Sequence, residues 1–546
     1  MESSALGDYE QLNVLVIDDN PLVHDLLKRA LYKLGIHNVK CAENAYYGLR
    51  LCAQTDFHVV LTAFNVKSDR DGFHILEEMK FKGYVNKRTV LIFLSSETDE
   101  ALVNSISELQ PDDFWVKPLN IKLVQDRLTK TLEIKKRLFN VFQCFDSKDF
   151  GKAVYYIDRH VSNPELQKYH LNMLKLKGES LLALLEYKDA ESYYRELLTK
   201  YKSSWVYLGF VKALLKQNKI DEIEQLIASL TERVETRFAA YDMLAQYHVE
   251  NEDFVAAYEE IKKAAELSPR NIARNKKVWD LARLNHDQRE QYLATVNMAK
   301  FAKNSIHDSP ELLLNVIRAA IDLAISVDGQ ESAELLQESE KYIKQLEKEY
   351  DNASHFKEQL VVARARIFNA KEEKDKAKRL VELQISPKPS TSIEDNLDKV
   401  KIYHELGQRE DAMQLLNAVK KQIACDNLSG AVTTKFVEQE AKERTEIHFT
   451  PKQLNSMAVE FFKKKKMAPA LRSLEQALQL TPKNVKVGLS LLKVLVAIHR
   501  SEGLDKGQCE LAKSTIASIE SSELDEVQQH HFNELNDELK KAVETE

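Results

Sequence analysis

Apolar residues along the chain follow two different spacings. In roughly the first 120 residues, short apolar runs alternate with segments whose apolar residues recur every three or four positions, and only the second spacing continues beyond. The runs predict strands near 14–17, 37–41, 57–63, 89–94 and 113–116. The segments between them predict helices near 21–34, 43–53, 72–82 and 98–109. This alternation is typical of a doubly wound, five-stranded parallel sheet, so we expect an α/β domain over residues 11–133, after a loose tail at 1–10.

The rest of the chain is predicted to be all α-helical. No glycine or proline occurs between Leu119 and Gly151, so the last helix of the α/β domain is expected to run with little or no break into the next domain. Beyond residue 135 the sequence repeats with a period in the thirties, most clearly at 238–271 and 451–484. In both units a proline follows the second helix, and two alanines twelve residues apart let the helices approach closely. These alanines are Ala245 with Ala257 and Ala458 with Ala470.

This pattern resembles the tetratricopeptide repeat (TPR), in which stacked helical pairs bury their apolar faces on their neighbours. The resemblance implies a solenoid of at least six helical pairs. We expect one TPR-like block at 134–385 and a second at 398–546, which ends in capping helices. Residues 386–397 are rich in proline and serine, and form either a linker between the blocks or a long loop between two helices.

Charged and polar residues stand at the ends of three predicted strands. Asp18 and Asp19 come directly after the first strand, Ser95 ends the fourth, and Lys117 follows the fifth. The carboxyl ends of parallel strands meet at one edge of a sheet, where α/β proteins bind ligands. Two adjacent acids at such an edge are costly unless they face a positive charge. We therefore expect a metal ion or a cationic side chain beside Asp18 and Asp19.

The strand-end residues and the strand–helix alternation resemble the receiver domain of two-component response regulators, a CheY-like domain with a flavodoxin-like fold. The resemblance implies that Asp18 and Asp19, together with the backbone of Asn65, form an acidic pocket for Mg²⁺. It covers about the first 130 residues and rests on several spaced motifs together.

The resemblance also assigns a switch. Ser95 and Lys117 would grip a phosphoryl group that an aspartate carries at the end of the central strand. As Ser95 moves toward that group, Phe114 on the last strand would turn inward. This movement would reshape the face formed by residues 98–131.

The sequence departs from the receiver family at the position of the phosphoacceptor. Ala63 stands where the family carries the aspartate, and a methyl group has no oxygen with which to form an acyl phosphate. Asp69 and Asp71 lie in the following loop, without the strand-end placement opposite Lys117. Mg²⁺ binding is accordingly expected to be weak or absent, which leaves Lys117 free to pair with the acids.

Composition narrows the class of protein. The 546 residues carry a net charge of −7 with acids and bases interspersed, which gives no electrostatic footprint for nucleic acid. No apolar run has the length needed for membrane insertion, and the start of the chain does not resemble an export signal, so a cytoplasmic location is expected.

The five cysteines form no CxxC pair. Glycine-rich phosphate loops, serine elbows and zinc-hydrolase motifs are lacking too, so no enzymatic activity is expected.

These observations favour a bacterial signalling protein of a phosphorelay that acts through protein–protein interaction. A receiver without its phosphoacceptor and a TPR scaffold would bind a histidine kinase or another response regulator. The expected contact surfaces are the face formed by residues 98–131 and the inner groove of the repeats. One alternative is a phosphorylation-gated switch in which Ala63 has been introduced in place of an aspartate. The other is a phosphatase-like regulator of a partner kinase or regulator, for which the sequence offers no placed acid or amide.

Overall fold

The computed structural model of the chain describes residues 9–66, 70–219, 223–233, 236–327, 329–349, 356–425, 430–520, 522, 524 and 526–543. The chain divides into two compact units. The first consists of Met1–Asn251, Glu259–Arg274 and Lys300–Asp308, and the second of Glu252–Tyr258, Asn275–Ala299 and Ser309–Glu546. Most of the expected tail at 1–10 lies outside the described residues, and a short 3-10 helix, η1 (Tyr9–Gln11), leads into the first strand.

The first unit opens with an α/β domain built on a five-stranded parallel sheet. Its strands follow the order β2-β1-β3-β4-β5, which confirms the predicted doubly wound sheet. All residues of β3 and β4 are buried, as expected for a parallel sheet covered on both faces. The strands are β1 (Asn13–Ile17), β2 (Asn38–Ala42), β3 (Val59–Ala63), β4 (Val90–Ser95) and β5 (Asp113–Val116).

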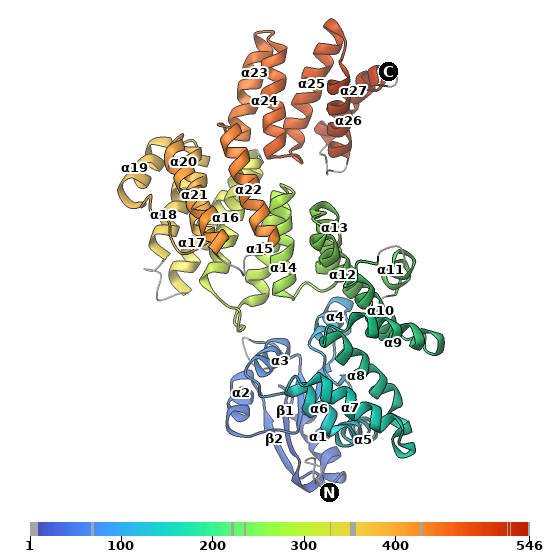
Figure 1. The fold of residues 1–546 in the computed structure, drawn as a ribbon. Coiled ribbons are helices and arrows are strands. Elements are labelled where there is room, and N and C mark those ends of the chain that lie inside the picture. The colour runs from blue at the N-terminus through green and yellow to red at the C-terminus, as the bar shows by residue number, and fades with distance from the viewer. Residues whose placement is uncertain are drawn as a thin grey trace. The chain divides into compact units, whose positions relative to one another are not determined.

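Five helices cover the two faces of this sheet (Figure 1). One apolar cluster joins one face to α1 and α5, and another joins the opposite face to α2, α3 and α4. An Asn or Asp side chain caps the first turn of each helix, which fixes the start of the helix close to the end of the preceding strand. The helices are α1 (Pro21–Lys33), α2 (Ala45–Gln54), α3 (Gly72–Phe81), α4 (Glu100–Glu108) and α5 (Ile121–Arg137).

The helix that leaves the α/β domain is interrupted at one residue, within the little or no break expected from the sequence. α5 ends at Arg137, and α6 (Phe139–Asp146) begins after Leu138, whose φ of −105° and ψ of 23° are not helical. Leu138 is fully buried in an apolar cluster that also contains residues of α6, α7 and α8. The change of direction at Leu138 therefore lets the apolar side of α6 pack onto the next helices.

The rest of the first unit is helical. Gly178 in α8 and Gly209 in α10 both face the ring of Tyr194 in α9, and a Cβ atom at either glycine would collide with that ring. The two glycines thus allow three successive helices to pack closely around one buried tyrosine. The helices are α7 (Phe150–Val161), η2 (Pro164–Tyr169), α8 (His170–Ala183), α9 (Tyr187–Lys200), α10 (Ser204–Leu215), α11 (Glu224–Thr231), α12 (Arg237–Glu250) and α13 (Phe254–Leu267), the last of which is shared with the second unit.

In the second unit, successive helices pack as pairs, consistent with a helical repeat solenoid. The pairs are clearest for α16 with α17, α18 with α19, α20 with α21, and α23 with α24. The helices are α14 (Ile272–Leu284), α15 (Gln288–Ala302), α16 (Pro310–Ser326), α17 (Gly329–Glu349), α18 (Lys357–Ala370), α19 (Lys374–Gln384), α20 (Ile393–Glu405), α21 (Arg409–Cys425), α22 (Ala431–Glu446), α23 (Pro451–Lys463), α24 (Met467–Leu480), α25 (Val485–Glu502), α26 (Lys506–Glu520) and α27 (Glu526–Val543).

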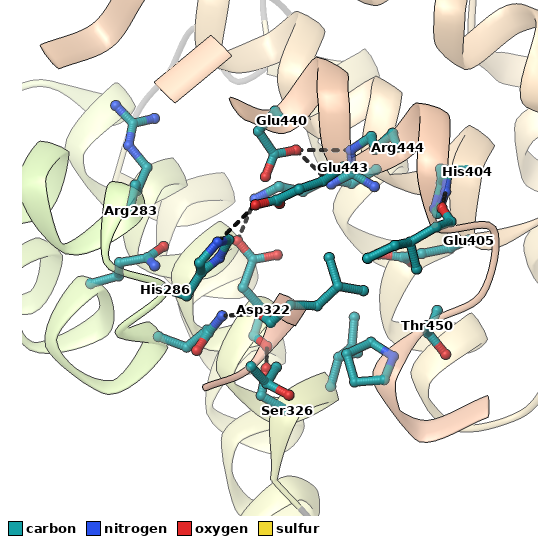
Figure 2. A pocket seen from close by; sticks show the side chains of 18 of the residues that line it. Arg283, His286, Asp322, Ser326, His404, Glu405, Glu440, Glu443, Arg444 and Thr450 are labelled. Atoms are coloured by element: carbon teal, nitrogen blue, oxygen red, sulfur yellow. Dashed lines mark hydrogen bonds and ion pairs between the residues drawn. The ribbon is translucent and has the colours of Figure 1, made fainter. Parts of the chain in front are cut away.

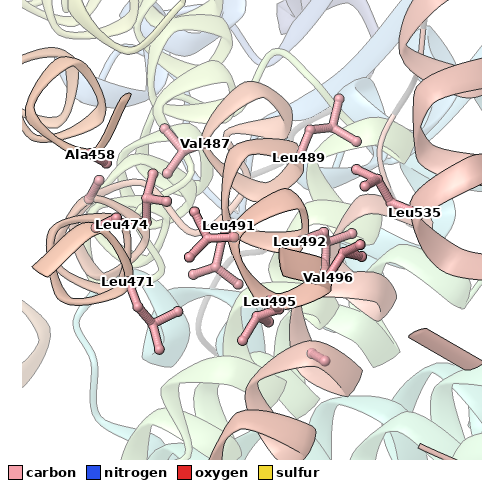
Figure 3. Packing of buried hydrophobic residues seen from close by; sticks show 14 of the residues in the cluster. Ala458, Leu471, Leu474, Val487, Leu489, Leu491, Leu492, Leu495, Val496 and Leu535 are labelled. Carbon is pink, nitrogen blue, oxygen red and sulfur yellow. The ribbon is translucent and has the colours of Figure 1, made fainter. Parts of the chain in front are cut away.

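The C-terminal helices share one apolar core. Ala458 in α23 and Ala470 in α24 are both buried, as the alanine spacing requires for close helix packing. Around them, leucines and valines of α24 and α25 interdigitate, and Leu535 of α27 closes the cluster (Figure 3). This arrangement buries the apolar face of each helix on its neighbours.

The proline- and serine-rich segment at 386–397 lies between packed helices. α20 already begins at Ile393, and a single apolar cluster contains Val381 and Ile385 before the segment and Val400 and Ile402 after it. Asn396 is fully buried and bonds to both the backbone N–H and the carbonyl oxygen of Ser390. The segment is thus built as a loop between two helices of one core.

Candidate functional site

The polar residues singled out in the sequence meet at one edge of the sheet. Asp18 follows β1, Ala63 is the last residue of β3, Ser95 is the last residue of β4, and Lys117 follows β5. The parallel register aligns the ends of these strands, because Ala63 lies opposite Leu94 and the next residue of β4 is Ser95. The structure therefore brings together an acid, a methyl group, a hydroxyl and an ammonium group.

Asp18 and Lys117 form the ionic centre of this acid pocket. The carboxylate of Asp18 is fully buried, and its Oδ2 lies 2.7 Å from Lys117 Nζ. Its other oxygen accepts a hydrogen bond of 2.9 Å from the backbone N–H of Asn20. A buried carboxylate is tolerated when it is both paired and hydrogen-bonded, and Asp18 meets both conditions. Asp19 is partly exposed beside it.

Ser95 and Phe114 belong to β4 and β5, which are separated from β1 and Asp18 by the central strand β3. Ser95 is buried, and its Oγ accepts a hydrogen bond of 2.9 Å from the backbone N–H of Glu97, so the hydroxyl holds the turn after β4. Phe114 is half-buried and stacks on Phe93, with ring centres 6.1 Å apart and planes 8° from parallel. Both side chains thus have well-defined neighbours without any bound group.

Among the described residues that follow β3, no acid enters the pocket. Asp71 accepts a hydrogen bond from the backbone N–H of His74 as the cap of α3, and its other oxygen lies 2.6 Å from Arg270. Asp69 lies outside the described residues, and Asn65 is exposed. Gly72 lies close against the end of β3, because a side chain at this position would collide with the carbonyl group of Ala63.

A magnesium ion does not fit the acid pocket in this arrangement. Mg²⁺ requires near-octahedral oxygen coordination, whereas one oxygen of Asp18 is paired with Lys117 and the other with a backbone N–H. Among the residues that the structure describes, no three His, Cys, Asp or Glu side chains gather as a metal site. A metal ion would first have to displace Lys117 from Asp18.

Part of the expected partner face, 98–131, is covered by the first unit itself. Asn104 Nδ2 of α4 donates to the carbonyl oxygen of Leu267 at 3.1 Å, and Ser105 Oγ lies 3.2 Å from Ser268 Oγ. Glu108 pairs with Arg274 at 2.6 Å. These contacts bury Asn104 and Ser105, so the α4 part of the face is engaged by residues 267–274.

The start of α3 makes a related contact with Arg270, in the turn between α13 and α14. The guanidinium group of Arg270 lies 5.1 to 5.6 Å from the ring centres of Phe64, Phe73 and Phe301, in addition to its ion pair with Asp71. An arginine within about 6 Å of aromatic rings is held by cation–π attraction. Arg270 therefore joins Phe64, Phe73 and Asp71 of the α/β domain to Phe301 of the first unit.

A second charged site lies on the inner face of the second unit, which we define by Arg283, Asp322, Arg366, Lys401 and His404. These side chains come from α14, α16, α18 and α20 and border a cavity of about 130 Å³ (Figure 2). Arg366 is buried at the centre of its ion pairs, 2.7 Å from Asp322 and 2.8 Å from both Asp398 and Glu405. The buried charges on this face thus balance one another.

The titration of the inner face follows from these pairs. Burial raises the pKa of Asp322, but Lys401 and Arg366 outweigh burial and bring this pKa to about 2. Burial lowers the pKa of His404 to about 4. Burial also lowers the pKa of His286, but the hydrogen bond and charge of Glu443 outweigh it and leave that pKa raised. Asp322 is therefore ionised and His404 neutral near pH 7.

Sequence reasoning expected an inner groove of the repeats as a contact surface, but it did not identify the charged residues of the inner face. The signal was present, because Arg318 and Asp322 interrupt the otherwise apolar sequence of α16, and Arg366 does the same in α18. Charges within an apolar helical face indicate buried ion pairs. The identity of their partners depended on which helices pack together.

Comparisons with known proteins place the α/β domain in a family. The model of the response regulator receiver domain matches residues 14–133. The chain is similar to a probable chemotaxis protein CheY of Rhizobium etli, with 27% identity over 113 residues, which are 21% of this chain and 86% of that protein. It is also similar to a cyclic di-GMP phosphodiesterase of Thermotoga maritima, with 24% identity over 184 residues, but this match spans only 46% of that protein and 33% of this chain.

Two solved structures are similar to the same region. One is the chemotaxis response regulator CheY4 of Vibrio cholerae, with 20% identity and a TM-score of 0.21 over 22% of this chain and 98% of that chain. The other is the BeF3-activated DrrB receiver domain, with 23% identity and a TM-score of 0.20 over 22% of this chain and 97% of that chain. No helix among the described residues is long and apolar enough to cross a membrane.

Proposed function

We propose that this chain, whose residues 14–133 form a response regulator receiver domain, acts in a bacterial phosphorelay without accepting a phosphoryl group itself. The observation that carries the proposal is Ala63 at the end of β3, on the edge where Asp18, Ser95 and Lys117 meet. A methyl group at this position cannot form an acyl phosphate. The receiver then signals through its binding of protein partners.

The ion pair in the acid pocket supports this reading. In receivers that accept a phosphoryl group, the strand-end lysine grips that group. Here Lys117 instead neutralises the buried Asp18. We therefore expect Mg²⁺ to bind weakly or not at all, because it has to displace an ammonium group.

We propose that the helical pairs after the receiver are TPR-like repeats and form the output of the protein. Every described element after β5 is helical, which suits a scaffold for partner proteins. The proposed partner is a histidine kinase or another response regulator in the cytoplasm. No DNA readout and no catalytic step are part of this proposal, and phosphodiesterase activity belongs to the relative that carries that name.

The partner surface on the receiver is narrower than the sequence suggests. Because residues 267–274 engage α4, the proposed free part of the face is the side of β5 and α5. Val116 and Leu123 are apolar and exposed there. A partner that binds this side can do so without displacing the helices of the first unit.

Affinity capture with the full-length chain tests the proposed function. We expect a histidine kinase or a response regulator to be retained from an extract of the source cells, identified by mass spectrometry, and retained equally with and without a small phosphodonor. A matched chain with Val116→Asp and Leu123→Asp should lose this partner while it keeps the receiver fold. Capture that requires the phosphodonor would instead support a phosphorylation-gated switch.

A further inference from the structure

Helix α22 stands apart from the pairing of its neighbours. It lies between the pair α20–α21 and the pair α23–α24, and it packs on α21 through Val437 and Ala441, which belong to the same apolar cluster. On another side, Gln439 contacts Leu284 and His286, about 150 positions earlier in the chain, at and just after the end of α14. α22 therefore does not act as one half of a helical pair.

The other side of α22 lies on the inner face (Figure 2). The ring centre of Phe436 is 4.5 Å from the guanidinium group of Arg283, and Glu443 Oε1 is 2.9 Å from His286 Nε2. Gln439 Nε2 lies 3.3 Å from the carbonyl oxygen of Leu284 and donates to it. Burial raises the pKa of Glu440, but Arg444 of the same helix, together with Lys401 and His286 on this surface, outweighs burial and leaves that pKa lowered.

The spacing of these contacts is that of a bound helix. Phe436, Gln439, Glu440 and Glu443 occupy positions i, i+3, i+4 and i+7, which is how an amphipathic helix anchors in a groove. Apart from Phe436 these anchors are polar, whereas the pair α23–α24 meets through alanine and leucine. Glu443 thus pairs with His286 of the groove, whereas Glu440 pairs with Arg444 of α22 itself and lies near Lys401 and His286.

We propose that α22 is an internal ligand that occupies the inner face, and that this face binds a partner helix of the same chemistry by displacing α22. The partner carries an aromatic residue followed by acids four and seven positions later. This inference rests on the proposed function in taking the helical pairs as the partner-binding part, and it names the chemistry of the partner.

The charges of the inner face explain the selectivity. A partner without the second acid would leave His286 covered but without the carboxylate that Glu443 provides, which penalises binding. α22 is tethered and so competes at a high effective concentration. Any change that weakens α22 in place should therefore strengthen the binding of a free helix.

A labelled peptide of residues 430–447 tests the inference on the full-length chain. We expect the wild-type chain to bind it weakly, and a chain with Phe436→Ala and Glu443→Gln to bind it at least about tenfold more tightly, because the competing internal helix has lost its two anchors. A chain with Glu438→Gln, an exposed position of α22, is the matched control and should bind like the wild type. A peptide that carries Phe436→Ala and Glu443→Gln should not bind either chain.

Two results would overturn the inference. One is a doubly substituted chain that keeps the wild-type circular dichroism and melting temperature but binds the peptide no better. The other result applies if that chain unfolds, in which case the wild-type chain is measured with excess peptide. Displacement of α22 should speed hydrogen exchange at residues 431–446, and unchanged exchange there would overturn the inference. Neither experiment uses a phosphodonor or a signalling partner. A negative result would therefore count against the role of α22 and not against the proposed function.

Discussion

The acid pocket of the receiver and the inner face of the second unit both bury charge, but they do so on different scales. In the pocket, one carboxylate and one ammonium group meet at the ends of two strands. On the inner face, Arg366 forms ion pairs with three carboxylates from two other helices, and Lys401 also pairs with one of these carboxylates. The pocket can therefore be changed by a single residue, whereas the inner face responds as a network.

The largest effect is expected on the inner face. Arg366→Met should lower the free energy of unfolding of the second unit by about 3–5 kcal/mol, because it leaves buried carboxylates without their cation. The matched control is Arg364→Met, which removes an exposed arginine paired with Glu347 and should cost less than about 1 kcal/mol. Urea unfolding monitored by circular dichroism measures both. Equal losses for the two variants would contradict a network centred on Arg366.

A smaller effect is expected in the acid pocket. Lys117→Met should destabilise the receiver by about 1–3 kcal/mol, because the buried Asp18 loses its partner while the hydrogen bond from Asn20 remains. The same change should tighten Mg²⁺ binding, since the metal no longer competes with an ammonium group. Fluorescence of the buried Trp115 during a Mg²⁺ titration reports the second effect. A wild-type chain that binds Mg²⁺ as tightly as Lys117→Met would refute the competition.

The contact around Arg270 should be weaker still. Arg270→Ala is expected to cost about 1–2 kcal/mol, the sum of its cation–π contacts and its ion pair with Asp71. The readout is disulfide formation in a chain with Ser105→Cys and Ser268→Cys, whose hydroxyls lie 3.2 Å apart. Arg270→Ala should slow this cross-link, while Arg159→Ala, at an exposed site on α7, should not. No cross-link in the parent chain would show that the contact is open in solution.

The smallest effect concerns pH. The folded-state pKa of His286 is raised, so its pairing with Glu443 contributes stability that is fully present below the unfolded pKa of about 6.5 and is lost as pH rises through the folded value. Glu440 also faces this histidine and acts in the same direction. The melting temperature of His286→Gln should thus fall further below that of the wild type at pH 6 than at pH 8.5. A difference in melting temperature between the two chains that is larger at pH 8.5 than at pH 6 would contradict this prediction.

The sheet and the acid pocket could be predicted because their signals are local. Apolar runs mark β1, β3 and β4, and residues at the ends of strands must lie at one edge whatever the rest of the chain does. The position of the break at Leu138 could not be predicted, because neither glycine nor proline marks it. It follows from the packing of α6 on later helices.

The inner face could not be derived from local patterns. Arg366 is 44 positions from Asp322 and 39 from Glu405, and their pairing depends on how successive helical pairs stack. The position of α22 is still harder to predict, because its sequence is that of an ordinary polar helix and the residues it contacts on α14 lie about 150 positions away. The same holds for Arg270, whose aromatic neighbours come from three separate segments.

Intact mass spectrometry of the full-length chain after incubation with a small phosphodonor and Mg²⁺ shows whether the receiver accepts a phosphoryl group. We expect no phosphoryl adduct on the wild-type chain, because Ala63 offers no nucleophile. Ala63→Asp, measured in parallel, should gain one base-labile phosphoryl group, since Asp18, Ser95 and Lys117 are already in place. A base-labile adduct on the wild-type chain, mapped to Asp71 or any other carboxylate of the receiver, would show that the receiver is phosphorylated despite Ala63.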